Sequence, residues 1–405
     1  MKKLFFFASA ALVIAACAKT TLDNTATPDV PVTFQAANYS VATKAGEVSV
    51  FKDFKNFKSL AYLHAVGVDL NADGTQKAAT FQNFFGAGET ISPYNSSNVI
   101  IATPTPATTD VAYWAPSHSY YWPKDEHSYV NFVAWYGTDG SSAVNPTVTY
   151  TYDTAWEATM TWDFSNETVG SAGANLLYAD MAWRYNGNRD ASYKLNGLAA
   201  GYKGVPMLFH HALAQINVKA YVAAATATPA NPAIETGITD GTATWTILLK
   251  NVKITSVIKN GTLALTNTDP GNTDIQAWSG SWALAAEAEL GDLVRTGDYT
   301  VTEIAKPAAG TTTGDLIAAT CVIPQSLGAS VVLSFDMDIT TTYTNVTHHE
   351  VIPFAVKLND MGTTAWAMNT KYTYFLQINP SQKTVLFDPA VAADWADGTT
   401  TEKTL

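Results

Sequence analysis

The stretch VPMLFHHALAQINVKAYV, Val205–Val222, decides the fold class. Its apolar residues fall at alternate positions, which is the period of a half-buried β-strand. In one continuous strand the even positions from Leu208 to Val222 share a face, and the odd positions share the other. His210 and His211 would then point to opposite faces of the strand. They therefore cannot chelate one metal ion together.

A second histidine pair, His348–His349, lies far downstream in THHE and obeys the same rule if it is on a strand. An HExxH helix would place two imidazoles on one face around a general base, and the sequence has none. We therefore interpret the histidines as structural strand residues, packed at a sheet edge or in a core. No metal ion and no cofactor is predicted.

Motifs of enzyme active sites are also missing. The chain has no G-x-S-x-G elbow, no P-loop and no G-x-G-x-x-G after a strand. Its 7 histidines and 35 acidic residues are not spaced as a triad or a carboxylate pair. The chain is predicted not to be an enzyme, although a secreted hydrolase with ionisable groups converging in a cleft is an alternative.

Strand patterns dominate the rest of the chain, separated by Gly, Asn, Asp and Ser. They include PVTFQA, SLAYLHAVGVDL, YVNFVAWYG, TVTYTY, ATMTWDF, TWTILLKNVKITSVIKNGTLALT, SVVLSFDMDITTTYT and KYTYFLQINPSQKTVLFDP, a hairpin that turns at NPSQ. Two short helices are predicted. One begins in FKDFKNFKSL, where Phe51, Phe54 and Phe57 are three apart, and the other covers Trp282–Val294. Many strands with few short helices favour an all-β fold of β-sandwiches.

The first residues are read as a lipoprotein signal, 1–16. Lys2 and Lys3 precede a run of 13 apolar residues, which is too short to span a bilayer. The last three residues of this run, Ile14-Ala15-Ala16, resemble a lipobox, so Cys17 is expected to become an acylated N-terminus. Residues 17–30 would form a polar tether, and Cys321, the other cysteine, would stay unpaired.

The charge of the chain argues against one class of partner, and one Gly- and Asn-rich segment predicts a domain boundary. Only 14% of residues are charged and the net charge is −12, which makes nucleic acid an unsuitable partner. The segment at 186–204 predicts a boundary between an N-terminal β-sandwich, 31–200, and a C-terminal one, 205–405. The low-complexity stretch at 223–233 is read as a hairpin loop within the second unit.

Two further patterns leave alternatives open. The loop Asp69–Gly74 matches the first half of a calcium loop, but Thr80 stands where a bidentate glutamate is needed, so a hairpin turn is the alternative. Trp156 and Trp162 would share one strand face and could stack on sugars, or they could fill a sandwich core.

Several pieces, taken in their order, resemble the fimbrillin-like lipoproteins of the Bacteroidetes, the subunits of type V pili. They are the lipobox, VPVTFQAANYSVATKAG, YYWPKDEHSYVNFVAWYG, NLLYADMAW, LFHHALAQINVKAYV, CVIPQSL and YTYFLQINPSQKTVLFDPAVAADW. The resemblance implies two transthyretin-like β-sandwich domains in tandem. It also implies a lipidated precursor at the outer membrane.

In that family a surface protease cuts the loop after the first strand, and a neighbouring subunit fills the opened groove. The family's Thr-Arg-Ala reads Thr43-Lys44-Ala45 here, so Lys44 is the expected processing site. Asp153-Thr154-Ala155 matches the phylum's sequon for O-glycosylation at Thr154. The implied partners are other fimbrial subunits by donor-strand exchange, the outer membrane through the lipid, and host or bacterial surface ligands.

The predicted function is that of a structural subunit of cell-surface fimbriae that supports adhesion. The alternative is a glycan-binding lipoprotein of the outer-membrane surface. That alternative requires an exposed row of aromatic side chains and no removable first strand.

Overall fold

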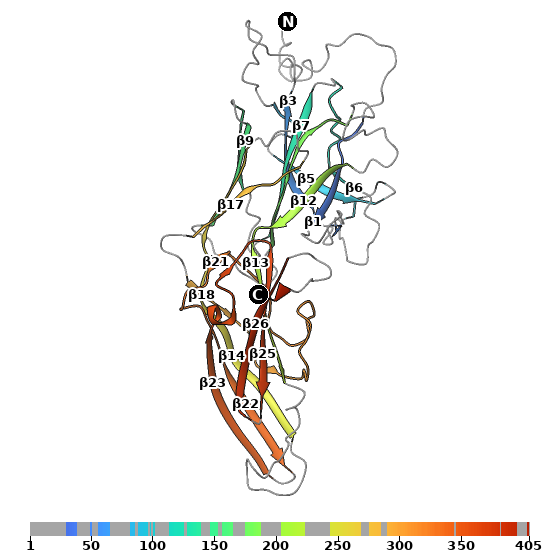
Figure 1. Ribbon diagram of the computed structural model, residues 1–405. Coiled ribbons are helices and arrows are strands. Elements are labelled where there is room, and N and C mark those ends of the chain that lie inside the picture. Colours follow the sequence, from blue (N-terminus) through green and yellow to red (C-terminus); the bar gives the residue numbers. More distant parts are fainter. Residues whose placement is uncertain are drawn as a thin grey trace, which may run out of the picture.

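The computed structural model is an elongated, almost entirely β molecule (Figure 1). It describes residues 30–38, 49–50, 56–64, 82–85, 88–95, 98, 100–101, 113–124, 128–138, 146–152, 156–164, 175–187, 204–222, 244–268, 275–284, 290–343, 346–380, 382–394 and 403–404. In this part of the chain the one helical element is a 3-10 turn, η3 (Leu358–Met361), and no helix is long and apolar enough to cross a bilayer. The predicted all-β fold is confirmed.

The largest sheet closes on itself. Its central strands pair in a ring that runs β3–β7–β10–β12–β1–β6–β5 and back to β3. Its strands are β1 (Phe34–Asn38), β2 (Ser49–Val50), β3 (Phe57–His64), β4 (Gln82–Asn83), β5 (Glu89–Tyr94), β6 (Tyr113–Pro116), β7 (Tyr129–Thr138), β10 (Asn175–Ala179), β11 (Met181–Tyr185), β12 (Val205–His211) and β16 (Ile275–Gln276). Closure places an apolar cluster inside the ring, with residues from opposite sides of the sheet in contact.

A smaller sheet packs against the outside of this ring. Its strands are β8 (Thr147–Tyr152), β9 (Trp156–Asp163), β15 (Gly261–Thr268) and β17 (Ser279–Leu284). A second apolar cluster, which contains Trp135, Trp162 and Leu263, joins β7, β9 and β15. Strands from both halves of the sequence therefore meet in one layer.

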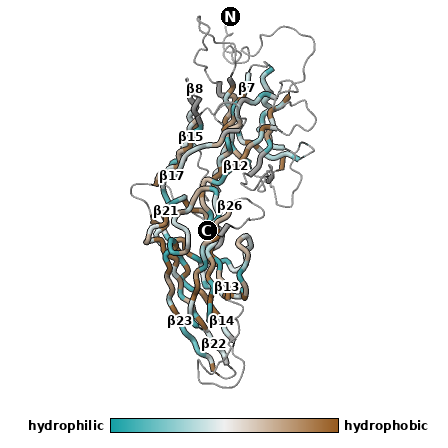
Figure 2. The backbone as a smooth tube through the Cα atoms, viewed as in Figure 1, coloured by the Kyte–Doolittle hydropathy of each residue, from teal (hydrophilic) through white to brown (hydrophobic). Residues whose placement is uncertain are grey.

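The other end of the molecule is a pair of facing sheets around a third apolar cluster (Figures 1 and 2). One sheet contains β13 (Ala214–Val222), β20 (Asp315–Val322), β25 (Thr370–Asn379), β26 (Thr384–Asp394) and β27 (Lys403–Thr404). The other contains β14 (Thr244–Ile258), β18 (Leu290–Val294), β19 (Tyr299–Thr300), β22 (Val332–Tyr343) and β23 (Val346–Lys357). A two-stranded sheet of β21 (Gln325–Ser326) and β24 (Ala365–Trp366) lies beside them.

The alternation of apolar and polar side chains along the strands explains why the two sheets pack face to face. In β22, Leu333, Phe335 and Met337 are buried between the sheets, whereas Ser334 and Asp336 lie on the outer face. The predicted hairpin that turns at residues 379–382 is confirmed, because β25 and β26 pair on either side of it and Lys383 N–H donates to Pro380 O at 3.3 Å.

Residues 301–314 form a strap over the outer face of β13 and β25. Val222 N–H donates to Glu303 O at 2.7 Å, and Ala220 N–H donates to Gly314 O at 2.9 Å. The Lys306 ammonium lies 4.4 Å from the centre of the Phe375 ring. The strap therefore covers the polar face of β13, where Lys219 becomes fully buried.

The deciding stretch Val205–Val222 is two strands rather than one. The odd positions are buried in β12, and the even positions point into the core from β13, because Ala212–Leu213 interrupts the alternation. β12 belongs to the ring and β13 to a sheet at the other end of the molecule. The chain thus passes from one sheet to the other at 212–213.

Both predicted helices are wrong where the structure describes them. Phe57 begins strand β3, and the range Trp282–Val294 contains the end of β17 and all of β18. β17 and β18 both lie at sheet edges, where one side of the strand faces solvent. Residues 285–289 of that range lie outside the described residues.

Candidate functional site

The first strand, β1, fills a place in the ring between β12 and β6. It runs parallel to β12, with Phe34 opposite Val205 and Asn38 opposite Phe209. It pairs antiparallel with β6, with Phe34 opposite Trp114. A strand in this position is needed to keep the sheet closed.

Three alternate side chains anchor this segment in the core. Val30, Val32 and Phe34 are 4%, 2% and 0% exposed. The Phe34 ring meets Phe132 edge to face at 5.2 Å, and it meets Phe57 in the same way at 5.9 Å. Such aromatic pairs contribute beyond the apolar area they bury. The segment therefore presents an apolar ridge to the inside of the ring.

Main-chain hydrogen bonds hold the same segment from both sides. Val32 N–H donates to Tyr120 O at 2.8 Å, and Trp122 N–H donates to Val30 O at 3.0 Å. On the other side, Val205 N–H donates to Thr33 O at 2.8 Å. These bonds depend on backbone geometry and not on side-chain identity, so another strand of suitable pattern could form them.

Gly204 sets how closely β12 approaches β1. Its φ is +104°, and a Cβ there would lie 2.5 Å from the carbonyl carbon of Thr33. Only glycine fits such a backbone-to-backbone approach. The pattern analysis placed Gly204 at the end of a turn-rich segment and missed this contact, since nothing local reveals that β1 lies opposite.

The covalent link between β1 and the rest of the chain is the segment 39–48. β1 pairs antiparallel with β2, which follows that segment, with Ala37 opposite Val50. The predicted processing residue Lys44 falls in the segment and lies outside the described residues. So do Cys17, the loop Asp69–Gly74 and Thr154.

The first histidine pair lies on opposite faces of β12, as predicted. His210 Nε2 is 2.9 Å from Asp180 Oδ1, and its ring stacks on Tyr178 at 5.3 Å. His211 is only 2% exposed, and its main-chain N–H donates to Asn369 Oδ1 at 3.1 Å. The two rings thus belong to different surroundings.

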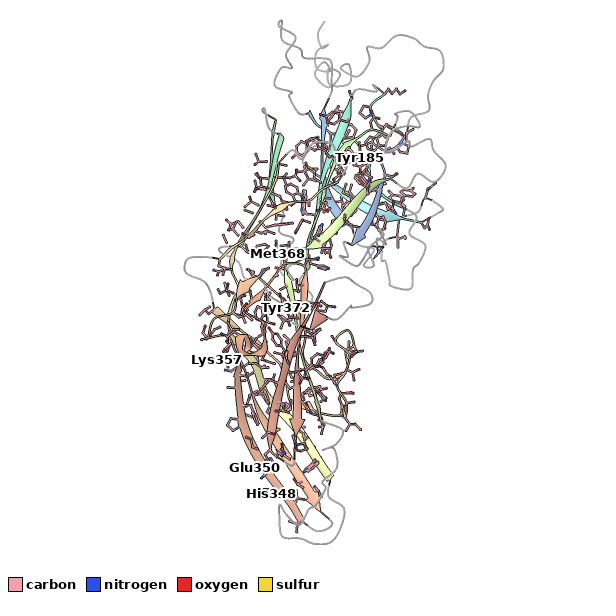
Figure 3. All side chains as sticks on the ribbon, in the orientation of Figure 1. Tyr185, His348, Glu350, Lys357, Met368 and Tyr372 are labelled. Carbon is pink, nitrogen blue, oxygen red and sulfur yellow. The ribbon has the colours of Figure 1, made fainter. Side chains whose placement is uncertain are left out.

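The second pair lies on β23, towards the end of the molecule away from the ring (Figures 1 and 3). His349 Nε2 is 2.6 Å from Asp338 Oδ1, and His348 Nε2 is 3.9 Å from Glu350 Oε2. The Lys250 ammonium and the His349 imidazole help to hold the pKa of Asp338 below its usual value against the opposing effect of desolvation. Within the described ranges, no three His, Cys, Asp or Glu side chains are grouped to hold a metal ion.

The paired tryptophans do not form an exposed row in the part of the chain that the structure describes. Trp162 is fully buried between the ring and the smaller sheet. The side chain of Trp156 lies outside the described residues. Cys321 is also buried, and burial raises the pKa of its thiol to about 12. Trp162 therefore offers no surface on which a sugar could stack, and the Cys321 thiol is inaccessible.

Acid should weaken the fold through His211. Burial, with Lys371 and His210 nearby, lowers the pKa of His211 from 6.5 to about 3. Because the unfolded chain takes up a proton near pH 6.5 and the folded chain does not, stability falls as the pH drops below that value. Between pH 7.5 and 5 the free energy of unfolding should drop by about 2 kcal/mol through this group. Urea denaturation at both pH values measures it, and His211→Gln should remove this part of the change. An unaltered pH dependence in the variant would contradict the assignment.

The comparison with protein families identifies the kind of protein. The fimbrillin-like family model matches residues 70–395, so the chain belongs to the fimbrillin-like family. No curated protein matches the chain. Membership supports a fimbrial or adhesion-related subunit at the cell surface, and it indicates a structural role.

Solved structures that match most of this chain come from Bacteroides, Porphyromonas and Parabacteroides species. A candidate cell adhesion protein from Bacteroides uniformis is 15% identical, with a TM-score of 0.37, over 91% of this chain and 100% of that one. The fimbrial anchor protein Mfa2 from Porphyromonas gingivalis is 10% identical, with a TM-score of 0.24, over 92% and 99%. A fimbrial assembly protein from Parabacteroides distasonis is 10% identical, with a TM-score of 0.28, over 93% and 99%.

Proposed function

We propose that the protein is a structural subunit of cell-surface fimbriae that assembles by strand exchange and supports adhesion to host or bacterial surfaces. Proteolysis after Lys44 would detach β1, and a strand of a neighbouring subunit would take its place. The observation that carries this proposal is the position of β1 and of the residues just before it. β1 completes a closed sheet, and Val30, Val32 and Phe34 are buried in its core. Yet the link from β1 to β2 is one segment that contains Lys44.

Removal of β1 would change the ring in two ways. It would leave β12 and β6 with unpaired main-chain groups, which act as templates for another strand. It would also expose the rings that Phe34 covers, Phe57, Phe85 and Phe132, at a cost of roughly 25 cal/mol per Å² of apolar area. A subunit in this state binds a replacement strand strongly because both costs are recovered together.

The same cut would release the subunit from the membrane. We propose that Cys17 carries the lipid that holds the precursor in the outer membrane, with residues 17–30 as tether. Because Cys17 precedes Lys44, one cleavage would remove the anchor and the first strand together. Two tandem β-sandwich units, 31–200 and 205–405, remain our proposal for the domains. Pairing of β15 with β9, and of β12 with β1, joins the two ranges closely.

Cleavage between β1 and β2 should convert a monomer into a polymer. A recognition site for a sequence-specific protease at 43–45 allows one cut in the purified chain. The uncut protein should elute from a sizing column as a monomer, and the cut protein as polymers that survive mild detergent. The matched control carries the same protease site in the stretch 223–233, where cutting leaves β1 attached, and should stay monomeric.

Mass spectrometry of protein recovered from the cell surface identifies the N-terminal residue that natural processing leaves. Polymers should begin at Ala45, the precursor should begin at an acylated Cys17, and Lys44→Ala should abolish the shorter form. Equal elution of cut and uncut protein would refute strand exchange. Polymers that still begin at Cys17 would refute release of the first strand.

A further inference from the structure

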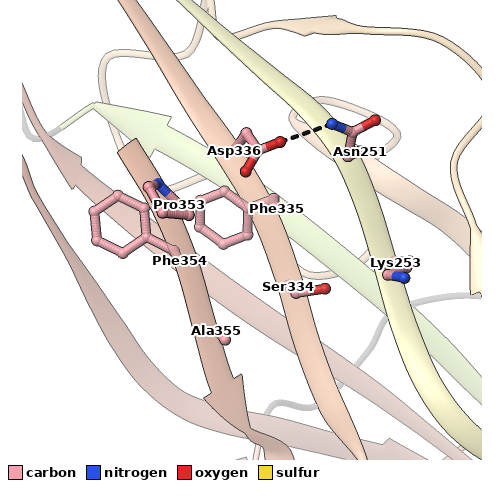
Figure 4. Close-up of a pocket in the computed structure, with 8 residues that line it drawn as sticks. All are labelled: Asn251, Lys253, Ser334, Phe335, Asp336, Pro353, Phe354 and Ala355. Atoms are coloured by element: carbon pink, nitrogen blue, oxygen red, sulfur yellow. Dashed lines mark hydrogen bonds between the residues drawn. The ribbon is translucent and has the colours of Figure 1, made fainter. Parts of the chain in front are cut away.

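A hollow lies on the outer face of the sheet that contains β14, β22 and β23, far from β1 (Figures 1 and 4). Its volume is about 400 Å³, within the roughly 300–1,000 Å³ of small-molecule sites. The residues that line it come from three adjacent strands and are Asn251, Lys253, Ser334, Phe335, Asp336, Pro353, Phe354 and Ala355. The sequence analysis did not find this place, because its residues are distant in the chain.

A β-bulge builds the hollow. Lys250 lies opposite Asp336 and Lys253 lies opposite Ser334, so three steps on β14 match two steps on β22. Since Asp336 and Ser334 share a face, the extra residue brings Lys250 and Lys253 to that face as well, which a regular strand would not do. Asn251 occupies the bulge with φ +53°. Its side-chain amide donates to Asp336 Oδ2 at 2.7 Å.

The floor of the hollow is small and apolar. Pro353 lies opposite Asp336, and Ala355 lies opposite Ser334. The two apolar side chains of β23 therefore lie beside the two polar side chains of β22, on the same face of the sheet. Beneath them Phe335 and Phe354 stack at 5.5 Å, with planes 19° apart. Figure 4 shows the two rings next to each other. The short side chains of Ser334 and Ala355 leave room above the sheet.

The polar groups around this floor are of three complementary kinds. Asn251 holds one oxygen of Asp336, and among the described residues no cation lies within ion-pair distance of that carboxylate. Ser334 supplies a hydroxyl group. The Lys253 ammonium is a donor, with Asp292 only loosely placed at 3.9 Å. A hydrogen-bond acceptor (Asp336), a hydroxyl group (Ser334) and a donor (Lys253) thus surround an apolar patch. The opposite charges of Lys253 and Asp336 leave the hollow with no net charge.

We propose that this hollow binds a neutral carbohydrate. A sugar offers adjacent hydroxyl groups for Asp336, Ser334 and Lys253, and an apolar C–H face for the Pro353 ring. A phosphate or carboxylate ligand would meet the Asp336 charge, and a cationic ligand would meet Lys253. The site lies on one subunit and does not depend on strand exchange, so it can be tested in the uncut monomer.

Binding by one subunit is weak because the hollow is open and holds only one or two sugar rings. A fibre that repeats the site would gain strength from many simultaneous contacts. This gain from many sites is the one part of the inference that rests on the proposed assembly into fibres. Each subunit should bind at millimolar concentration, and a polymer should bind a glycan-coated surface at least about 100-fold more tightly.

Titration of the uncut, isotope-labelled protein tests the site. Methyl glycosides of mannose, galactose, glucose and N-acetylglucosamine, and their common disaccharides, are added up to 50 mM while amide NMR shifts are followed. Ligand-dependent shifts are expected in β14, β22 and β23 around the hollow. Asp336→Asn should weaken binding by about tenfold or more, since a hydrogen bond to a charged acceptor is lost. Lys253→Met should also weaken it.

The matched control is Asp360→Asn, which removes an exposed carboxylate from η3 outside the hollow and should leave binding unchanged. Thermal unfolding of each variant separates lost binding from lost fold, and a second hollow variant, Ser334→Val, tests the same face without touching a charge. The proposal is overturned if no sugar shifts these amides, or if Asp336→Asn and Ser334→Val bind like the parent chain. Failure of assembly with intact binding would instead refute only strand exchange.

Discussion

Replacing Phe34 by alanine should lower the free energy of unfolding by about 3–5 kcal/mol, the usual cost of a phenylalanine deleted from a core. Phe34 is fully buried and contacts Phe57, Phe85 and Phe132 across the ring. Urea denaturation of the uncut protein measures the loss.

The adjacent residue supplies the control. Gln35 is exposed on the same strand, and Gln35→Ala should change stability by less than about 0.5 kcal/mol. After cleavage at 43–45, the Phe34→Ala segment should also leave the ring faster, which raises the rate of polymer formation. If Phe34→Ala and Gln35→Ala were equally stable, β1 would not be an anchored part of the core.

Removal of the Asp315 carboxylate should cost about 3–5 kcal/mol, because it leaves a buried ammonium without its counter-charge. Lys219 is fully buried under the strap. Its Nζ donates to the carbonyl oxygen of Thr311, to Thr313 O at 3.0 Å and to Asp315 Oδ1 at 2.5 Å. Three acceptors match the three N–H bonds of an ammonium. Asp315→Ala breaks this set and should loosen the strap.

A double variant distinguishes a buried charge from simple loss of packing. Lys219→Met with Asp315→Leu removes both charges and should recover much of the stability that Asp315→Ala loses. The matched control is Lys306→Met, which deletes an exposed partner of Asp388 at 3.2 Å from the same strap and should cost less than about 1 kcal/mol. If Asp315→Ala and Lys306→Met lowered the free energy of unfolding equally, the buried pair would contribute no more than an exposed ion pair. Chemical denaturation and protease digestion of residues 301–314 provide the measurements.

Strands with a simple period could be predicted from the sequence. β22 follows its alternating pattern closely, since it packs one face against a core. β7 is an apolar run that is buried on both faces, and the hairpin β25–β26 pairs as its pattern predicts. The prediction of one strand over Val205–Val222 failed at Ala212–Leu213. There the buried positions change from odd to even. The sequence shows this change when Val205–His211 and Ala214–Val222 are each examined as a separate strand.

Pairings between distant strands could not be predicted in this way. Nothing near Phe34 indicates that its neighbour is Val205, and nothing near Lys253 indicates Pro353. The burial of Lys219 also depends on a strap almost a hundred residues away in the chain. The ring and the outer hollow both consist of such pairings, whereas the apolar pattern of the first strand could be recognised locally.

The passage of the chain from β12 through Ala212–Leu213 into β13 has a mechanical consequence. A force that draws the two ends of the molecule apart crosses these two residues. On each side the strand has a parallel neighbour in register, β1 or β25, so many hydrogen bonds share the load in shear instead of opening one by one. The crossing itself is clamped, because Trp282 Nε1 donates to Ala212 O at 2.7 Å and Asn369 N–H donates to Leu213 O at 3.2 Å. The molecule is built as a link that resists tension along its length.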